Sequence, residues 1–312
     1  MVIGSMSPVI SELEPGDIGQ ACQLFQDVFG AAISPAHWRW KYLQGPRLGG
    51  VNLVARSATG ELLAHTGASV FPGVMRGNAL SMAQLGDFMV DSTARGGYSA
   101  STVYPRLMKA MQETLVSRFG NPYAYGFAGV RQFKLGIRLG YYRVLQPYRP
   151  AYFKPAGPGP AFWLAREMDW DTERLDTLWS RRRSEIAGPR VARSGAYLGW
   201  RYRDHPVNRY QLWRLSHLSR DRGWFVTRTM PDGAVCVVDA LLPAAADPAR
   251  LLSTLAAALN KTLPVLPPLY SWLFQNDADP ALEPVVGGEF KLRQWHSSDP
   301  NPVFQPGDTD VF

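Results

Sequence analysis

The sequence predicts an α/β (α+β) protein with two tandem domains, each a mixed, mostly antiparallel central sheet flanked by helices. Three observations predict this class. The chain has 312 residues, which suits two domains of roughly 150 residues each. Hydrophobic residues make up 46% of it and charged residues 19%, so there is enough apolar material for real cores, and wholesale disorder is excluded. A short aromatic phrase also occurs twice, about half a chain length apart.

The aromatic phrase is Trp40-Lys41-Tyr42 followed by Pro46, and it is matched by Trp200-Arg201-Tyr202 followed by Pro206. A strand-like run follows each copy at nearly the same distance. The offset of 160 residues is too long for a solenoid, whose repeats span about 20–50 residues, and it favours one domain copied once. The alternative is coincidence among common aromatic residues, and the agreement of four positions and their context argues against it.

The boundary between the domains is expected at Lys154–Pro160, whose prolines and glycines suit a linker. We therefore expect an N-terminal domain at residues 1–154 and a C-terminal domain at residues 161–312. The aromatic side chains of the repeated phrase are expected to pack the second helix of each domain against its sheet.

The first half begins with an amphipathic helix, because apolar residues recur at helical spacing between Ala21 and Phe29. Asp17, followed three residues later by Gln20, predicts the N-terminal cap of this helix. Apolar and β-branched runs, separated by a turn at Ala58-Thr59-Gly60, then predict a meander of strands. These strands are Val51–Ala55, Leu62–Phe71 and a third centred on Leu85–Val90.

A glycine-containing interruption at Arg95-Gly96-Gly97 ends the meander, and helical spacing resumes from Val103 to Leu115. Pro105 is tolerable there only because it falls in the first turn of the helix. The rest of the half is predicted as a strand (Tyr123–Phe127), a short helix (Gln132–Leu139) and a last strand pair (Tyr142–Phe153).

The second half repeats this order of elements more loosely. A helix, three strands and another helix are predicted from the same periodicities. They are Leu175–Ile186, Tyr210–Leu215, Trp224–Thr229, Val235–Leu242 and Leu251–Leu259. The run Arg181-Arg182-Arg183 stands without any nucleic-acid-binding motif, so it is interpreted as the face or end of a helix.

Charge and cysteine content narrow the class of protein. The net charge of +7 favours a partner that carries phosphate or carboxylate groups over a cationic one. Cys22 and Cys236 match no metal or redox spacing, so we expect a reduced intracellular protein without a metal. The apolar stretch Leu251–Leu259 is shorter than the roughly 20 residues of a spanning helix, and no basic-then-apolar leader opens the chain. The expectation is a cytoplasmic protein with no membrane span and no DNA partner.

Several motifs of the first half resemble the GNAT superfamily of acyl-CoA-dependent N-acyltransferases. The segment Leu85–Asp91 running into Arg95–Ala100 is similar to the fourth strand of that family and its Arg/Gln-x-x-Gly-x-Gly/Ala loop. Leu139-Gly140-Tyr141 resembles the Leu-Gly-Phe that ends the family's fourth helix. The phrase Trp38–Tyr42 further resembles tandem-domain members linked to polysaccharide or lipid modification. The resemblance covers nearly the whole chain as two copies.

The resemblance implies an acyl-CoA site at the loop, because backbone N–H groups at a helix N-terminus hold a diphosphate. The loop departs from the family pattern at Tyr98, which stands where the central glycine is expected. An ordinary strand-to-helix turn remains the alternative interpretation. The second half lacks a counterpart of the loop, so it is expected to be degenerate and to shape an acceptor pocket or complete the structure. The implied cofactor-binding residues are Phe88, Met89, Val90, Arg95, Gly96, Gly97, Tyr98, Ser99 and Ala100. Arg131, near the short helix, is a further candidate for contact with the CoA phosphates, with a solvated helix charge as the alternative.

The catalytic residues are less well defined. Many members of the family use a tyrosine on the short helix to reprotonate the leaving thiolate, and Gly136 occupies that position here. Asp87 on the strand is a candidate base, with His65 as a further candidate, and Tyr125 is a candidate acid. Asp91 is interpreted as a turn or cap acceptor.

The resemblance therefore implies direct transfer of an acyl group, most simply acetyl from acetyl-CoA, to an amine of a small molecule or sugar. Two alternatives stay open. Acyl carrier protein or aminoacyl-tRNA would replace CoA as the donor, and both are acidic partners that suit the positive charge. The other alternative is a catalytically inactive binding protein with the same fold. Oligomeric state, acyl chain length and acceptor do not follow from the sequence.

Overall fold

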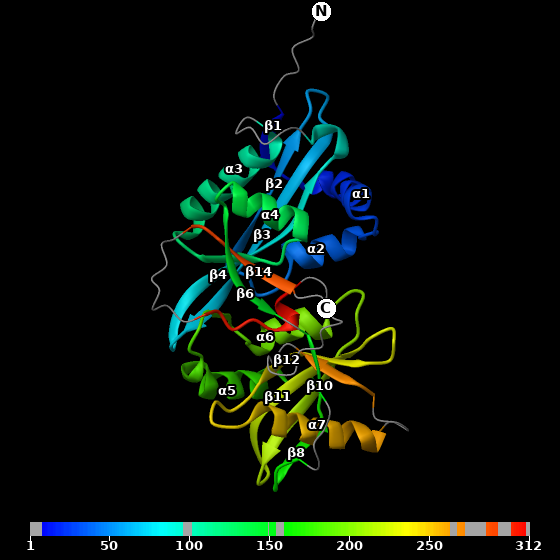
Figure 1. Cartoon of the computed structure of the whole chain (residues 1–312), viewed down its shortest axis with the longest axis vertical. Helices are drawn as coiled ribbons and strands as arrows, with labels where there is room; N and C mark the ends of the chain where they lie inside the picture. The colour runs from blue at the N-terminus through cyan, green and yellow to red at the C-terminus, as the bar shows by residue number, and fades with distance from the viewer. Residues whose placement is uncertain are drawn as a thin grey trace, which may run out of the picture. The chain divides into compact units, whose positions relative to one another are not determined.

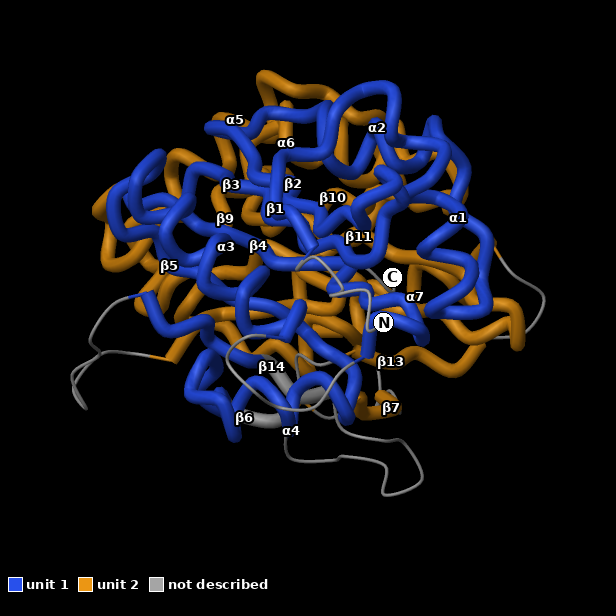
Figure 2. The backbone as a smooth tube through the Cα atoms, turned by 90° about the horizontal axis from the view of Figure 1, so that it is seen from above, with its two compact units in different colours: residues 1–73, 80–145, 287–299 blue, residues 74–79, 146–286, 300–312 orange. Residues whose placement is uncertain are grey.

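The computed structural model describes most of the chain in seven segments, which are residues 8–95, 102–148, 150–153, 159–262, 267–271, 285–292 and 301–309. The chain divides into two compact units, shown in two colours in Figure 2. Unit 1 comprises residues 1–73, 80–145 and 287–299, and unit 2 comprises residues 74–79, 146–286 and 300–312. Each unit is built around its own mixed sheet with helices, which confirms the predicted fold class.

The first sheet has the strand order β1-β2-β3-β4-β5-β14-β6 (Figure 1). Pairing is antiparallel between β1, β2 and β3 and parallel between β4 and β5. The strands are β1 (Val9–Glu12), β2 (Gly49–Arg56), β3 (Leu62–Met75), β4 (Asn78–Val90), β5 (Tyr123–Gly126), β6 (Tyr142–Tyr148) and β14 (Val285–Phe290). The helices of this part are α1 (Ile18–Phe29), α2 (Pro35–Leu43), α3 (Val103–Phe119) and α4 (Val130–Arg138).

Helices cover both faces of the first sheet because each face carries buried apolar side chains. On one face, Leu107 and Met111 of α3 pack with Val51 and Leu53 of β2. On the other face, residues of α1 and α2 such as Trp38 pack with Val54, Leu62 and Met89. The sheet is therefore the middle layer between two helical layers.

The second sheet has the strand order β7-β13-β12-β11-β10-β8. Helix α7 packs on it through a core that includes Leu251, Leu255, Phe225 and Val237, and α5 contacts β11. The strands of this sheet are β7 (Ala151–Phe153), β8 (Trp163–Glu167), β10 (Gln211–His217), β11 (Arg220–Thr229), β12 (Val235–Leu241) and β13 (Leu269–Ser271). The short strand β9 (Arg190–Val191) pairs with β3 and belongs to the first sheet. The helices are α5 (Thr172–Arg182), α6 (Gly195–Leu198) with a π-helical turn at Gly199–Arg203, and α7 (Pro248–Thr262).

The two copies of the aromatic phrase have the same local structure. Both lie in a helical segment ahead of a sheet strand, and in both a serine caps that segment: Ser34 Oγ accepts from the His37 backbone N–H and Ser194 Oγ from that of Tyr197, each at 3.1 Å. Ser34 and Ser194 are separated by the same 160 residues as the phrase itself. The repeat predicted from the sequence is therefore present in the backbone and not only in the residue types.

Two predicted details are wrong. The segment Tyr142–Phe153 does not form a strand pair, because β6 joins the first sheet beside β14 while β7 pairs with β13 in the second sheet. Asp17 does not cap α1 through its side chain. Its carboxylate instead accepts the Glu14 N–H at 2.7 Å and forms an ion pair with Arg56.

Candidate active site

The centre of the first sheet opens where β4 and β5 separate. Their parallel register runs from Met82↔Tyr123 to Leu85↔Gly126 and has no further partners among the described residues. Two residues later Asp87 has a φ of +47°, a conformation that breaks the regular strand. The stretch Phe88–Val90 therefore continues without β5 beside it, which leaves that edge of β4 available to a ligand.

A cavity of about 870 Å³ lies beside this opening, between β4, the beginnings of α3 and α4, and the end of α1. Phe88 and Val90 line it, whereas the alternate residue Met89 is fully buried in the core beneath α1 and α2. The volume is typical of pockets for small molecules and cofactors. The Met89 side chain therefore has no access to the cavity, although its backbone belongs to the opened strand.

The polar part of the cavity wall is basic. Arg95, Arg131, Lys134 and Arg138 line it, and none of its described lining residues is an aspartate or glutamate. Arg95 Nε donates to the Val90 carbonyl oxygen at 3.0 Å, which holds that side chain across the end of β4. An arrangement of four cations around one cavity favours a ligand with several negative charges.

The N-terminus of α3 opens onto the same cavity. Thr102, Val103, Tyr104 and Pro105 all line it, and the Thr102 side chain makes no capping hydrogen bond to the described part of the helix. The first N–H groups of a helix lack internal partners and carry the positive end of its dipole. This helix start is therefore suited to a phosphate or diphosphate group.

Tyr104 carries a hydroxyl without a partner at this site. Its ring lies 4.5 Å from the ring of Phe88 and 6.5 Å from that of Tyr141. The hydroxyl oxygen is buried and makes no hydrogen bond with any described residue, whereas the Tyr141 hydroxyl donates to the Pro105 carbonyl oxygen at 3.0 Å. Burial raises the pKa of Tyr104 above its usual value, so this hydroxyl stays protonated and can donate to a bound ligand.

Asp87 faces α2 and belongs to a buried polar network. Its carboxylate Oδ2 accepts hydrogen bonds from Lys41 Nζ and from the Tyr42 hydroxyl, each at 2.7 Å. Gly67 on β3 makes room for Tyr42, because a Cβ there would lie 2.4 Å from the tyrosine ring. Burial by itself raises the pKa of the Asp87 carboxyl, but the charge and hydrogen bond of Lys41, with the bond from Tyr42, outweigh it and leave the pKa below its usual value. A lowered pKa makes Asp87 a weak proton acceptor.

His65 completes this network from β3. Its Nδ1 lies 2.9 Å from the Asp87 carbonyl oxygen and its Nε2 lies 3.3 Å from Asn52 Oδ1. Both of these oxygens accept, and a neutral ring has one N–H. The shorter contact, to the Asp87 carbonyl, assigns the proton to Nδ1, and Nε2 then accepts from the Asn52 amide when its oxygen and nitrogen are exchanged. The ring is completely buried, and burial lowers the pKa of His65 to about 4. It is therefore uncharged at neutral pH and does not line the cavity.

The structure brings together only some of the residues implied by the resemblance. Phe88, Val90, Arg95 and Arg131 line the cavity, whereas Gly96, Gly97, Tyr98, Ser99 and Ala100 lie outside the described residues. Tyr125 on β5 is 1% exposed, with its ring near those of Tyr123 and Phe127. The catalytic assignments of Asp87, His65 and Tyr125 stay predictions. The burial of His65 and Tyr125 and the engagement of the Asp87 carboxylate by Lys41 and Tyr42 favour structural roles. Asp91 is a turn acceptor, as expected, and takes the Thr93 N–H at 2.8 Å.

The packing of α4 explains why Gly136 stands where many GNAT enzymes have a tyrosine. A Cβ on Gly136 would lie 2.0 Å from Cδ2 of the buried Tyr142 ring. No larger residue fits there while Tyr142 keeps its place. The sequence shows the glycine but not the ring that requires it.

Sequence reasoning missed two features of the site. One is Tyr104, which stands on the second residue of α3 and has no motif to mark it. The other is the ion pair of Lys41 with Asp87, which joins residues 46 positions apart. The signal available for Lys41 was its place in the repeated phrase, and for Tyr104 it was only its nearness to the predicted loop.

Within the described ranges, no helix has both the length and the apolarity needed to cross a bilayer. No group of three His, Cys, Asp or Glu side chains suited to a metal ion occurs in that same part of the chain.

Comparisons with known proteins bear on the fold. No family model matches the sequence, and no curated protein is significantly similar to it. Among solved structures, a probable N-acyltransferase from Enterococcus faecalis V583 is similar with a TM-score of 0.65, 13% identity, and coverage of 91% of this chain and 72% of that one. A GCN5-related N-acetyltransferase from Kribbella flavida has a TM-score of 0.65, 15% identity, and coverage of 90% and 70%.

A third similar structure is a tandem GNAT protein from the clavulanic acid biosynthesis pathway. Its TM-score is 0.59 at 13% identity, and the match covers 91% of this chain and 97% of that one. The match to this tandem protein, which has nearly the same length, thus extends over both units of the present chain. The chain therefore has the fold of the GCN5-related N-acetyltransferases, in their tandem arrangement.

Proposed function

We propose that unit 1 binds an acyl-CoA in the cavity beside β4 and transfers its acyl group, most simply acetyl, to an amine of a small molecule or sugar. The observation that carries the proposal is the cavity itself. It joins an opened strand edge, a helix N-terminus and four cations in one space of about 870 Å³. These are the features that hold a pantetheine chain and a diphosphate.

In this proposal each part of the cavity has a separate task. The N–H groups that begin α3, with Arg95 and Arg131, hold the diphosphate, and the opened edge of β4 at Phe88–Val90 aligns the pantetheine and polarises the thioester carbonyl. Attack by the neutral amine nitrogen forms the new C–N bond and breaks the C–S bond. The amine loses a proton and the thiolate gains one. Holding both substrates in one complex makes this step effectively intramolecular.

Asp87 and His65 act in this proposal as positioning residues. Asp87 sits at the irregular point of β4, and Lys41 and Tyr42 anchor its carboxylate while His65 donates to its carbonyl. Fixing this residue fixes where β4 leaves β5, and hence the direction of the next three backbone groups. A proton acceptor for the amine then has to come from solvent or from the acceptor substrate.

The two alternative functions differ in what binds and what reacts. A carrier protein presents the same pantetheine and fits the same strand edge, whereas aminoacyl-tRNA does not. The absence of a tyrosine at position 136, where the packing of Gly136 excludes one, favours an inactive binding protein. Release of free thiol from acetyl-CoA upon addition of a panel of amines supports the transferase. CoA binding without any release supports the binding protein, and carrier-protein or tRNA binding without CoA binding supports the other donors.

We expect Tyr104→Phe to weaken the affinity for acetyl-CoA about fivefold to tenfold, because the cavity then loses its free buried donor. Isothermal titration measures the change. Tyr152→Phe, which removes a hydroxyl from the second sheet, is the matched control and is expected to bind like the wild type. Equal affinities of the Tyr104→Phe variant and the wild type would show that this hydroxyl does not face the donor.

A further inference from the structure

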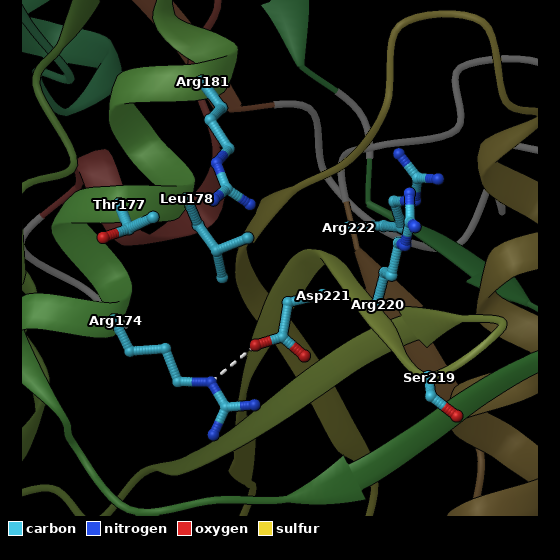
Figure 3. Close-up of a pocket in the computed structure, with 8 residues that line it drawn as sticks. All are labelled: Arg174, Thr177, Leu178, Arg181, Ser219, Arg220, Asp221 and Arg222. Carbon is cyan, nitrogen blue, oxygen red and sulfur yellow. Dashed lines mark hydrogen bonds and ion pairs between the residues drawn. The ribbon is translucent and has the colours of Figure 1, made fainter.

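Unit 2 contains a pocket of about 440 Å³ between α5 and the hairpin of β10 and β11 (Figure 3). Its charged lining consists of four arginines and one aspartate: Arg174, Arg181, Arg220, Arg222 and Asp221. In Figure 3, Arg181 extends from α5 toward the space that Arg220 and Arg222 border from the hairpin. The pocket belongs wholly to unit 2 and is separate from the cavity of unit 1.

The single carboxylate of the pocket is already engaged. Arg174 Nε donates to Asp221 Oδ2 at 2.5 Å, and Arg214 Nη1 lies 3.6 Å from the other oxygen. The side chains of Arg181, Arg220 and Arg222 make no hydrogen bond or ion pair with any described residue. Three arginines therefore line one small space without a counter-charge from the described chain. Arg181 and Arg220 are exposed and Arg222 is half-buried, so water screens their charges, and an anion that enters the pocket can contact all three.

Local structure explains why these arginines converge. On α5, Arg174, Leu178 and Arg181 are spaced i, i+4, i+7 and share one face. In the hairpin, Leu218 and Ser219 both have positive φ and form a tight turn. The β10–β11 register then shifts between Leu215 and Ser216, which leaves Arg222 as the extra residue of a bulge. A bulge breaks the alternation of a strand, so consecutive residues of β11 reach the same pocket.

We propose that this pocket binds the phosphate group of a small phosphate ester. A carboxylate would neutralise only one of the three guanidinium groups, whereas a phosphomonoester or diphosphate offers two or more charges and several acceptor oxygens. Arginine forks match phosphate oxygens in pairs. The pocket is concave and of the size of a ligand site, which favours a small molecule over the backbone of a nucleic acid.

A second hollow of about 540 Å³ adjoins the pocket and shares Ser219 with it. Phe162, Trp163 and Leu218 line it together with Arg166. Phe162 is 73% exposed and Leu218 is 62% exposed, so apolar surface stands next to the arginine pocket. This surface gives the ester a place for an aromatic or apolar organic group.

The test uses inorganic pyrophosphate, with inorganic phosphate and phenyl phosphate as further probes, titrated calorimetrically into the full chain. The titrations are made in an Arg131→Glu, Lys134→Glu background, so that the cavity of unit 1 does not compete for the anion. We expect pyrophosphate to bind the protein in this background. Adding the double substitution Arg181→Gln, Arg222→Gln is expected to lower the affinity for pyrophosphate at least about tenfold. Arg250→Gln, an exposed arginine of α7 outside the pocket, is the matched control and is expected to leave the affinity unchanged.

Three results overturn the proposal: no binding of pyrophosphate at millimolar concentration, equal losses in the pocket variant and the control, or binding of a single-stranded RNA that pyrophosphate does not displace. Phenyl phosphate is expected to bind more tightly than inorganic phosphate and to lose that advantage in Phe162→Ala. Equal binding of the two probes overturns the assignment of the apolar hollow. Acetyl-CoA titrated into the Arg181→Gln, Arg222→Gln variant with the native unit 1 reports on the proposed donor site separately, so the two proposals fail independently.

Discussion

Asp239→Asn is expected to lower the free energy of unfolding by about 3–5 kcal/mol, the largest change we expect from a single substitution in this protein. Asp239 is completely buried on β12. It accepts from Arg190 at 3.0 Å, from Arg193 Nε at 2.5 Å and from the Tyr202 hydroxyl at 2.7 Å. Removing its charge leaves two buried guanidinium groups with Asp308 as their remaining carboxylate. Breaking a buried ion pair from one side leaves an uncompensated charge in a medium of low polarity.

Urea unfolding monitored by circular dichroism measures the effect of Asp239→Asn. Asp308→Asn removes one of the two carboxylates that pair with Arg193 and is expected to have an intermediate effect. Asp169→Asn, an exposed carboxylate between β8 and α5, is the control and is expected to change the stability by less than about 0.5 kcal/mol. A loss below about 1 kcal/mol in Asp239→Asn contradicts the role given to this network.

Stability is expected to fall by about 3 kcal/mol between pH 6.5 and pH 4 because of His65. In the unfolded chain this ring takes up a proton near its ordinary pKa of 6.5, whereas in the native protein burial lowers the pKa to about 4. Between these values the unfolded state binds more protons, so stability decreases as the pH is lowered. Lys41 and Asp87 are the charged groups that face the ring. Because the pKa of the Asp87 carboxyl is lowered in the native protein, a further loss of stability follows as the pH falls through 3.8, the usual pKa of this carboxyl.

The pH prediction is checked by urea unfolding at a series of pH values in the wild type and in His65→Gln. The variant is expected to be less stable at pH 7 and to have a shallower slope between pH 6.5 and pH 4, since it has no ring to protonate. If both proteins lose stability in parallel over this interval, other groups carry the dependence and the buried neutral state of His65 is wrong.

Much of the fold could be predicted because its signals are local. The helical spacing of α1, α3 and α7 and the apolar runs of β2, β3 and β12 lie within single elements, and the structure has these elements within a few residues of the predicted bounds. The place of β14 could not be predicted in this way. It enters the first sheet between β5 and β6 from a part of the sequence some 140–160 residues away, and no local pattern records such a pairing.

The parts of the site that lie on one strand or beside the start of one helix could be predicted from the sequence. The opened strand at Phe88–Val90 and the cations Arg95 and Arg131 were expected, and they line one cavity. The direction of the Asp87 side chain was not predictable, because the positive φ at that residue interrupts the regular alternation of side chains along the strand. The two units share a tyrosine–aspartate hydrogen bond that the sequence repeat did not reveal. Tyr42 donates to Asp87 and Tyr202 donates to Asp239, both at 2.7 Å. In each unit this bond joins the second helix to the third strand of the meander.

The two copies of this bond differ in what surrounds them. In unit 1 the strand after Asp87 borders the open cavity. In unit 2 the residue after Asp239 is Ala240, whose carbonyl oxygen accepts from Gln305 Nε2 at 2.9 Å and whose N–H donates to Gln305 Oε1 at 2.5 Å. The side-chain amide of Gln305 thus satisfies the backbone that an extended ligand would use in the corresponding place. This occupancy favours unit 1 as the donor-binding unit.

Binding of the acyl donor in the cavity of unit 1 is tested by isothermal titration of acetyl-CoA into the wild type and into the Arg131→Glu, Lys134→Glu variant. We expect one acetyl-CoA to bind per chain and the affinity of the variant to be lower by at least about a hundredfold, because two charge-assisted contacts become repulsive. Arg250→Glu with Lys261→Glu, a matched pair of charge reversals on α7, is expected to bind as the wild type does. Absence of binding in the wild type, or equal affinity in the wild type and the cavity variant, would contradict the claim that the cavity of unit 1 holds the acyl donor.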